Sequence, residues 1–114
     1  MFRTAMLGLC ALMLASPALA MGTQGNPEAA PREAVGEYDQ LTALNSEVVM
    51  ALQPSRSTEA ERKAAAAINT RLQRAVSAAY KATTAKPFNR AEFDRQAALV
   101  RKEHAAACAV LSGC

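Results

Sequence analysis

Two prolines, Pro54 and Pro87, divide the chain beyond residue 31 into three segments, and in each segment apolar residues recur at spacings of three and four. This spacing places the apolar side chains on one face of an α-helix. Alternating runs of β-branched residues, which would favour strands, do not occur in the sequence. The pattern therefore predicts an all-α protein built from three helices.

The first helix is expected over residues 32–52. Glu33 and Glu37 lie near its start, where the helix dipole favours acidic side chains. The Gln53-Pro54-Ser55 stretch ends it. The expected apolar stripe of this helix consists of Val35, Tyr38, Leu41, Leu44, Val48 and Leu52.

The second helix has a well-marked start. Thr58 and Glu61 have the spacing of a capping box, in which the hydroxyl and the carboxylate each satisfy a free backbone N–H group. Pro87 ends the helix, because it biases Lys86 away from helical angles. The expected apolar stripe consists of Ala64, Ala65, Ile68, Leu72, Val76, Ala79 and Thr83.

The third helix is the best specified of the three. Asn89 is a strong N-cap residue, and Glu92 stands at the reciprocal capping position. Phe88 and Phe93 have the spacing of a hydrophobic staple across the helix start. The expected apolar stripe has the alternating spacing of a helix-packing seam and consists of Phe93, Ala97, Val100, His104, Ala107 and Leu111.

A short connection over residues 86–89 joins the second and third helices, which predicts an antiparallel helical hairpin of about residues 57–85 and 89–111. The fold class is therefore a small three-helix protein. The chain is rich in alanine and has no Trp. Because alanine buries little area, we expect a thin core, which favours dimerisation through the apolar seam of the third helix.

The first twenty residues have the features of a cleaved export signal. Arg3 supplies the positive charge, residues 5–15 form a short apolar core, and Ala18-Leu19-Ala20 supplies the small residues that a signal peptidase recognises. The apolar run is shorter than the roughly 20 residues needed to span a bilayer. We therefore expect cleavage after Ala20, a periplasmic location and no membrane span in the processed protein.

The predicted organisation is a signal peptide over residues 1–20, a flexible leader over 21–31, rich in Gly and Pro, and one helical domain over 32–114. Cys10 lies inside the apolar core of the signal and is preceded by Leu9 rather than by a small residue. This context does not fit a lipoprotein signal. Cys10 is therefore interpreted as one more apolar residue of the segment that is removed.

Charge is distributed unevenly along the chain. Acidic residues dominate residues 21–55, and basic residues dominate residues 56–114. One interpretation is internal, with an acidic first helix lying on a basic hairpin. The other is a face for an anionic partner, either a protein or an anionic envelope surface. Nucleic acid is a poor candidate, because no aromatic residues are interleaved with the cations. The cations of this predicted face are Arg62, Lys63, Arg71, Arg74, Lys81, Arg95, Arg101 and Lys102.

Two cysteines, Cys108 and Cys114, follow the predicted signal, and an even number in an oxidising compartment favours a disulfide. A left-handed Gly113 just after the helix would bring the two cysteines together as in a Schellman motif. An intermolecular bridge, or two thiols kept free for a metal ion, are the alternatives.

His104 is the only histidine. It precedes Cys108 by one helical turn, which is a usable spacing for metal ligands, and Met50 or Glu103 is a candidate further ligand. The simpler interpretation is a partly buried histidine that forms a hydrogen bond across the bundle, with no cofactor bound. The metal interpretation competes with the disulfide, because a bridged cysteine is not a thiolate.

The sequence gives no support for an enzyme. It has no Gly-rich phosphate loop, no nucleophile elbow and no HExxH motif. The close acidic pairs, Glu59 with Glu61 and Glu92 with Asp94, coincide with helix starts, where capping explains them.

The tract KPFNRAEFDRQAALVRKEHAAA, residues 86–107, resembles the C-terminal helix of Spy/CpxP-like periplasmic chaperones and of the related heavy-metal-resistance sensors. These sequences commonly have a short Pro-Phe-Asp turn followed by an Ala/Arg-rich helix, and Pro87-Phe88-Asn89 stands at the turn here. The Leu-Thr-x-x-Gln signature of the chaperones is reduced here to Leu41-Thr42, and the His/Met-rich metal segments of the sensors are missing. The resemblance implies a helical periplasmic protein of the envelope-stress or metal-response type.

These observations lead to a hypothesis of a non-enzymatic, chaperone-like binding protein of the envelope, which uses the basic hairpin and an apolar groove. A periplasmic metal-binding sensor or resistance protein using His104 is the second hypothesis. A structural accessory subunit of an envelope assembly is the third.

Overall fold

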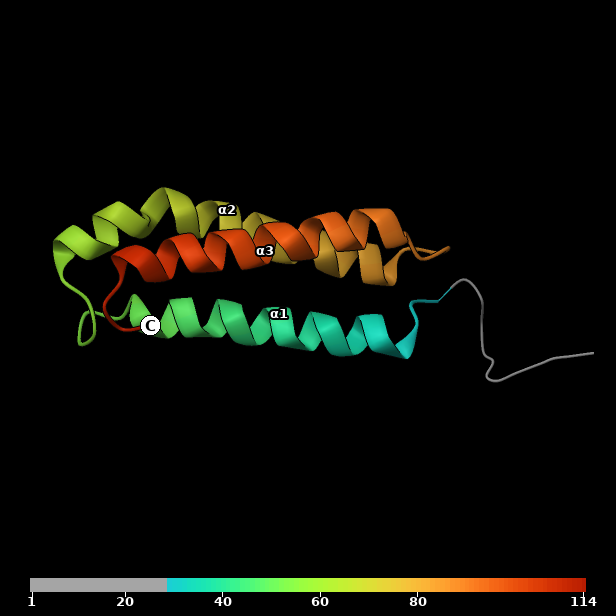
Figure 1. Cartoon of the computed structure of the whole chain (residues 1–114), viewed down its shortest axis with the longest axis horizontal. Helices are drawn as coiled ribbons and strands as arrows, with labels where there is room; N and C mark the ends of the chain where they lie inside the picture. The colour runs from blue at the N-terminus through green and yellow to red at the C-terminus, as the bar shows by residue number, and fades with distance from the viewer. Residues whose placement is uncertain (1–28) are drawn as a thin grey trace, which may run out of the picture.

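The computed structural model describes residues 29–114 and shows three α-helices side by side (Figure 1). Helix α1 spans Arg32–Ala51, α2 spans Glu59–Thr84 and α3 spans Arg90–Val110. The predicted signal peptide, Cys10 and most of the predicted leader lie outside the described residues. The all-α prediction and the hairpin of the second and third helices are confirmed.

The helices run in alternating directions along the chain, so α1 and α3 are parallel and α2 is antiparallel to both (Figure 1). Each helix packs against the other two, and the contact between α2 and α3 is the most extensive. Within residues 29–114, none of the helices combines the length and the apolar character needed to cross a bilayer.

The start of α2 is formed as its sequence predicts. The Thr58 hydroxyl accepts a hydrogen bond from the Glu61 backbone N–H, and the Glu61 carboxylate accepts one from the Thr58 backbone N–H, each at 3.1 Å. This capping box satisfies two donors that the helix itself leaves free. The α1–α2 connection is closed by Ser57, whose hydroxyl donates to the Leu52 carbonyl at 3.1 Å.

The start of α3 differs from the prediction in one detail. The Asn89 side chain caps the Glu92 backbone N–H at 3.1 Å, and the rings of Phe88 and Phe93 lie 5.9 Å apart as a staple. The Glu92 carboxylate does not return to the N-cap, however, and pairs instead with Arg95. Only one of the two hydrogen bonds of a capping box is therefore present at the start of α3.

The core lies along the shared axis of the three helices and is made largely of alanine, as expected. Phe93, Leu41 and Leu72 are the largest side chains that are fully buried. Small side chains allow the helix backbones to approach closely, and they compensate by dispersion contacts for the little apolar area that each one buries. The buried alanines are Ala34, Ala51, Ala65, Ala75, Ala79, Ala82, Ala97 and Ala107.

The predicted stripe of α3 is confirmed, since all of its apolar members are buried. This seam packs against α1 and α2 and is therefore not free to join a second copy. The prediction of a buried side chain is wrong for two members of the other stripes. Val35 is 47% exposed while its neighbour Ala34 is fully buried, and Ala64 is exposed while Ala65 is buried. The other members of both predicted stripes are buried or half-buried, and Leu41 and Leu72 are fully buried.

The chain after α3 turns back across the end of α1 (Figure 1). A disulfide joins Cys108 to Cys114, so the predicted bridge is present. The predicted cause is wrong, because no glycine in the described part of the chain has a positive φ. Gly113 instead lies against α1, where a Cβ added to it would stand 3.2 Å from the Ala51 Cα atom.

Candidate functional site

Two ion pairs and one hydrogen bond between a carboxylate and an imidazole join α1 to α3. The two partners of these pairs are 57, 64 and 57 residues apart in sequence. The first and third separations are equal, and the second is longer by seven residues, the length of one heptad. The acidic side of α1 therefore complements α3, which confirms the internal interpretation for that helix. Among residues 29–114, no α1 carboxylate forms an ion pair with α2. The three pairs are Glu33 with Arg90 at 3.0 Å, Glu37 with Arg101 at 3.0 Å, and Glu47 with His104 at 2.6 Å.

A groove of about 470 Å³ lies between α2 and α3. Ala75 and Ala78 of α2 and Leu99 of α3 give it an apolar lining. The two alanines leave space beside the leucine, because their side chains end at Cβ. The polar and charged residues that complete the lining are Arg71, Arg74, Ser77, Lys81, Gln96 and Glu103.

One carboxylate, that of Glu103, lies among the cations of this groove. Its side chain is only 8% exposed, and it accepts a hydrogen bond from Arg71 Nε at 3.1 Å. A buried carboxylate requires such a partner, because its desolvation is otherwise uncompensated. Within the described part of the chain, Arg74 and Lys81 have no carboxylate at ion-pair distance. Three cations and one carboxylate line the groove, so the groove carries a net positive charge.

Gln96 lines the α3 side of the groove. Its side-chain amide donates to the Glu92 carboxylate at 2.8 Å. The hydrogen bond from Gln96, followed by the one from Arg95, lowers the pKa of Glu92 below its ordinary value. A carboxyl group with a lowered pKa stabilises the fold above its unfolded-state pKa and loses this contribution as the pH falls through the folded-state value. This arrangement therefore persists at neutral pH.

The Arg71–Glu103 pair makes a stability prediction. We expect Arg71→Ala to lower the free energy of unfolding by about 1–3 kcal/mol, because Glu103 stays buried without its donor. Lys63→Ala on the same helix is the control. Lys63 and its partner Glu59 are each 79% exposed, so we expect a loss below about 0.5 kcal/mol. Urea denaturation followed by circular dichroism measures both. Equal losses in the two variants would contradict a structural role for the pair.

The structure brings together only part of the predicted anionic-partner face. Arg71, Arg74 and Lys81 line the groove. Arg101 lies on the side of α3 that faces α1, where it pairs with Glu37. The remaining cations of the predicted face lie outside the groove lining, and they are Arg62, Lys63, Arg95 and Lys102.

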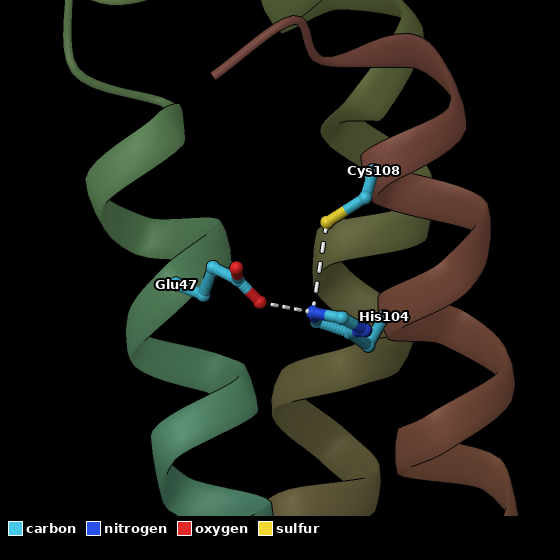
Figure 2. Close-up of side chains that lie close together, drawn as sticks. All are labelled: Glu47, His104 and Cys108. Carbon is cyan, nitrogen blue, oxygen red and sulfur yellow. Dashed lines mark hydrogen bonds and ion pairs between the residues drawn. The ribbon is translucent and has the colours of Figure 1, made fainter. Parts of the chain in front are cut away.

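A second cluster forms where α1 meets the last turns of α3, and Figure 2 shows its side chains pointing toward one another. His104 Nε2 lies 2.6 Å from Glu47 Oε1 and 3.6 Å from Cys108 Sγ. The three ligand atoms lie within 4.8 Å of one another. His104 therefore does bond across the bundle, as the simpler interpretation has it. The three residue types are those that bind metal ions, and the distance of 3.6 Å between nitrogen and sulfur suits two ligands of one ion.

The further ligands considered from the sequence do not reach this cluster. Met50 is 43% exposed, and its sulfur accepts a hydrogen bond from Gln53. Glu103 faces α2 and belongs to the groove. The residue that the sequence interpretation missed is Glu47. The signal for it is its separation of 57 residues from His104, which equals the separation of Glu33 from Arg90 on the same two helices.

Comparisons of this chain with known protein families, with curated proteins and with solved structures found no match. The resemblance to periplasmic chaperones and metal sensors therefore stays a prediction.

Proposed function

We propose that this chain is a non-enzymatic, chaperone-like binding protein of the periplasm, and that the groove between α2 and α3 holds short acidic segments of partner proteins. The observation that carries the proposal is the combination of an apolar lining with two cations, Arg74 and Lys81, that have no carboxylate partner among residues 29–114. An apolar surface with a few placed charges is typical of a binding site, since burial supplies affinity and the charges supply selectivity.

The spacing of the cations indicates the size of the bound segment. Arg74 and Lys81 are two helical turns apart on α2, a distance of roughly 10 Å. An extended peptide covers that distance in about three residues. A segment with carboxylates at its ends and a small apolar side chain between them would satisfy both cations and cover Leu99. The Glu103 carboxylate, which Arg71 neutralises, does not oppose such a ligand.

The export part of the proposal is supported by the sequence of residues 1–20 and by the disulfide. Intramolecular disulfides persist mainly in oxidising compartments such as the bacterial periplasm. A chaperone-like protein of this compartment acts without ATP, and the groove needs none, because binding and release follow from affinity alone.

Binding of a labelled acidic peptide tests the proposal. The probe is a short peptide of alternating Glu and Leu, and a peptide of alternating Lys and Leu is its charge control. We expect the double variant Arg74→Ala/Lys81→Ala to bind the acidic peptide about tenfold more weakly, a loss of about 1.4 kcal/mol. The affinity of the unaltered protein should fall as salt is raised, since exposed charges are screened. Fluorescence anisotropy measures both.

The matched control is Arg56→Ala/Lys63→Ala, which removes the same charge from the α1–α2 connection and from the first turns of α2. We expect it to change the affinity less than about twofold. Equal binding of the acidic and basic peptides, or an equal loss in both double variants, would overturn the proposal. Binding to vesicles of anionic phospholipid that depends on the groove, with no peptide binding, would also overturn it and identify the partner as a lipid surface.

A further inference from the structure

The disulfide and the Glu47–His104–Cys108 cluster share one sulfur atom. Cys108 Sγ is bonded to Cys114 and lies 3.6 Å from His104 Nε2. This nitrogen in turn lies 2.6 Å from Glu47 Oε1. Opening the disulfide would therefore place two thiols beside an imidazole and a carboxylate, all at the same end of the bundle.

The distance between the Cys108 sulfur and the His104 nitrogen suits a tetrahedral zinc ion. Bonds of about 2.3 Å to sulfur and about 2.0–2.1 Å to nitrogen place the two ligand atoms about 3.5–3.6 Å apart at a tetrahedral angle. The distance between Cys108 Sγ and His104 Nε2 is 3.6 Å. The Glu47 carboxylate is nearer to the ring than a shared metal ion would allow. Its side chain is 51% exposed, so it can move outward by a small rotation.

Cys114 remains within reach when the bridge opens. The residue before it, Gly113, lies against the last turn of α1, with its Cβ position 3.2 Å from both Ala51 Cα and Ala51 Cβ. Leu111, which is 2% exposed, anchors the same segment in the core. Neither contact involves a sulfur atom. They hold the tail beside the cluster as a source of a fourth ligand.

We propose that Glu47, His104, Cys108 and Cys114 form a redox-gated site for Zn²⁺ or a similar soft divalent cation, closed to metal in the disulfide form and opened by reduction. Two thiolates, one imidazole and one carboxylate make a complete four-coordinate set for zinc. In the oxidised protein only the imidazole and the exposed carboxylate remain as strong ligands. The reductant is a dithiol, as in thiol–disulfide exchange.

The exchange balances as follows. A dithiol reductant transfers two electrons to the Cys108–Cys114 bond, which breaks, and the reductant becomes a disulfide. Its two protons pass to the cysteine sulfurs. Zinc binding then forms two S–Zn bonds and releases those two protons to solvent. Metal binding and disulfide formation are mutually exclusive, so each opposes the other by mass action.

Zinc binding by the full chain tests the proposal, with Cys10→Ser present throughout so that only two cysteines remain. After reduction and removal of the reductant without air, we expect one zinc ion per chain by titration calorimetry. The oxidised protein should show no stoichiometric binding. Cobalt(II) should give thiolate charge-transfer absorption in the reduced protein only. Bound zinc should slow reoxidation of the two thiols, measured by thiol titration.

Single substitutions distinguish a zinc site made of all four residues from zinc binding by the two thiols alone. We expect Glu47→Gln and His104→Asn each to weaken zinc binding at least about tenfold, the lower end of the loss seen when even a supporting residue is changed. Glu37→Gln, which removes another charged pair between α1 and α3, is the matched control and should leave zinc affinity unchanged. Circular dichroism establishes whether each reduced variant is folded.

Three results would overturn the site. The first is an absence of zinc binding by the reduced protein while its helical signal is intact. The second is an affinity that is the same in Glu47→Gln, His104→Asn and Glu37→Gln, which would leave the two thiols as the whole binding group. The third is a reduced protein that unfolds and does not regain helix when zinc is added. The peptide-binding groove is a separate site, so its test succeeds or fails independently.

Discussion

Replacing Phe93 by alanine is expected to lower the free energy of unfolding by about 3–5 kcal/mol. Phe93 is fully buried and is the largest of the buried side chains. Eight of the fourteen buried apolar residues of the described core are alanines, which have no side-chain atoms beyond Cβ that could move into the space left behind. The cavity therefore stays open, and the cavity cost adds to the lost transfer free energy. Natural domains have a total stability of about 5–15 kcal/mol, so this variant is expected to be partly unfolded.

Tyr80→Ala is the aromatic control for this prediction. Tyr80 is 53% exposed, and its ring lies 5.8 Å from that of Tyr38. Removing it costs one exposed aromatic pair, so we expect a loss of about 0.5–1.5 kcal/mol. Urea denaturation at constant temperature gives both values. A loss for Phe93→Ala no larger than that for Tyr80→Ala would show that the core is not organised around the start of α3.

Removing the disulfide is the second large effect that we expect. The double variant Cys108→Ala/Cys114→Ala should lose about 2–3 kcal/mol, because the bridge no longer restricts the unfolded chain. Leu111 lies between the two cysteines in the sequence, and its side chain is 2% exposed in the folded protein. The bridge thus helps to keep a buried anchor in place beyond the end of α3.

Two measurements check this prediction together. Thermal unfolding reports the global loss. Amide hydrogen exchange of residues 107–111 reports whether the last turn opens locally. Thermal stability and exchange rates that both match those of the unaltered protein would contradict the prediction. Cys108→Ala in a chain that also carries Cys10→Ser is a useful companion, since it removes the bridge but leaves the Cys114 thiol, which tests for intermolecular pairing.

Local chemistry accounts for the parts of the fold that were predicted well. The capping box of Thr58, the N-cap of Asn89 and the staple of Phe88 with Phe93 are each complete within a few residues. Such interactions form as soon as the neighbouring backbone is helical, so their sequence spacing is sufficient to predict them. The apolar seam of α3 was predictable for the same reason, because it has one strong periodicity.

The errors arose where a helix offers two adjacent faces of similar apolar character. Val35 and Ala34 differ by one position, and the larger residue was the natural choice for the core. The structure buries Ala34 because a small side chain allows the helices to approach closely at that end of the bundle. The prediction for the disulfide was also only partly correct. The bridge was predicted, but Gly113 has no positive φ and lies instead against α1.

The number of helices, their approximate ends, the hairpin and the pairing of Cys108 with Cys114 could be predicted from the sequence, because each depends on neighbours close in the chain. Which charges meet is set by the packing of the helices. The packing places Glu47 beside His104, buries Glu103 against Arg71, and leaves Arg74 and Lys81 beside an apolar groove with no carboxylate partner among residues 29–114. These arrangements depend on the rotation of each helix about its axis, which the packing of all three helices sets and which no single segment encodes.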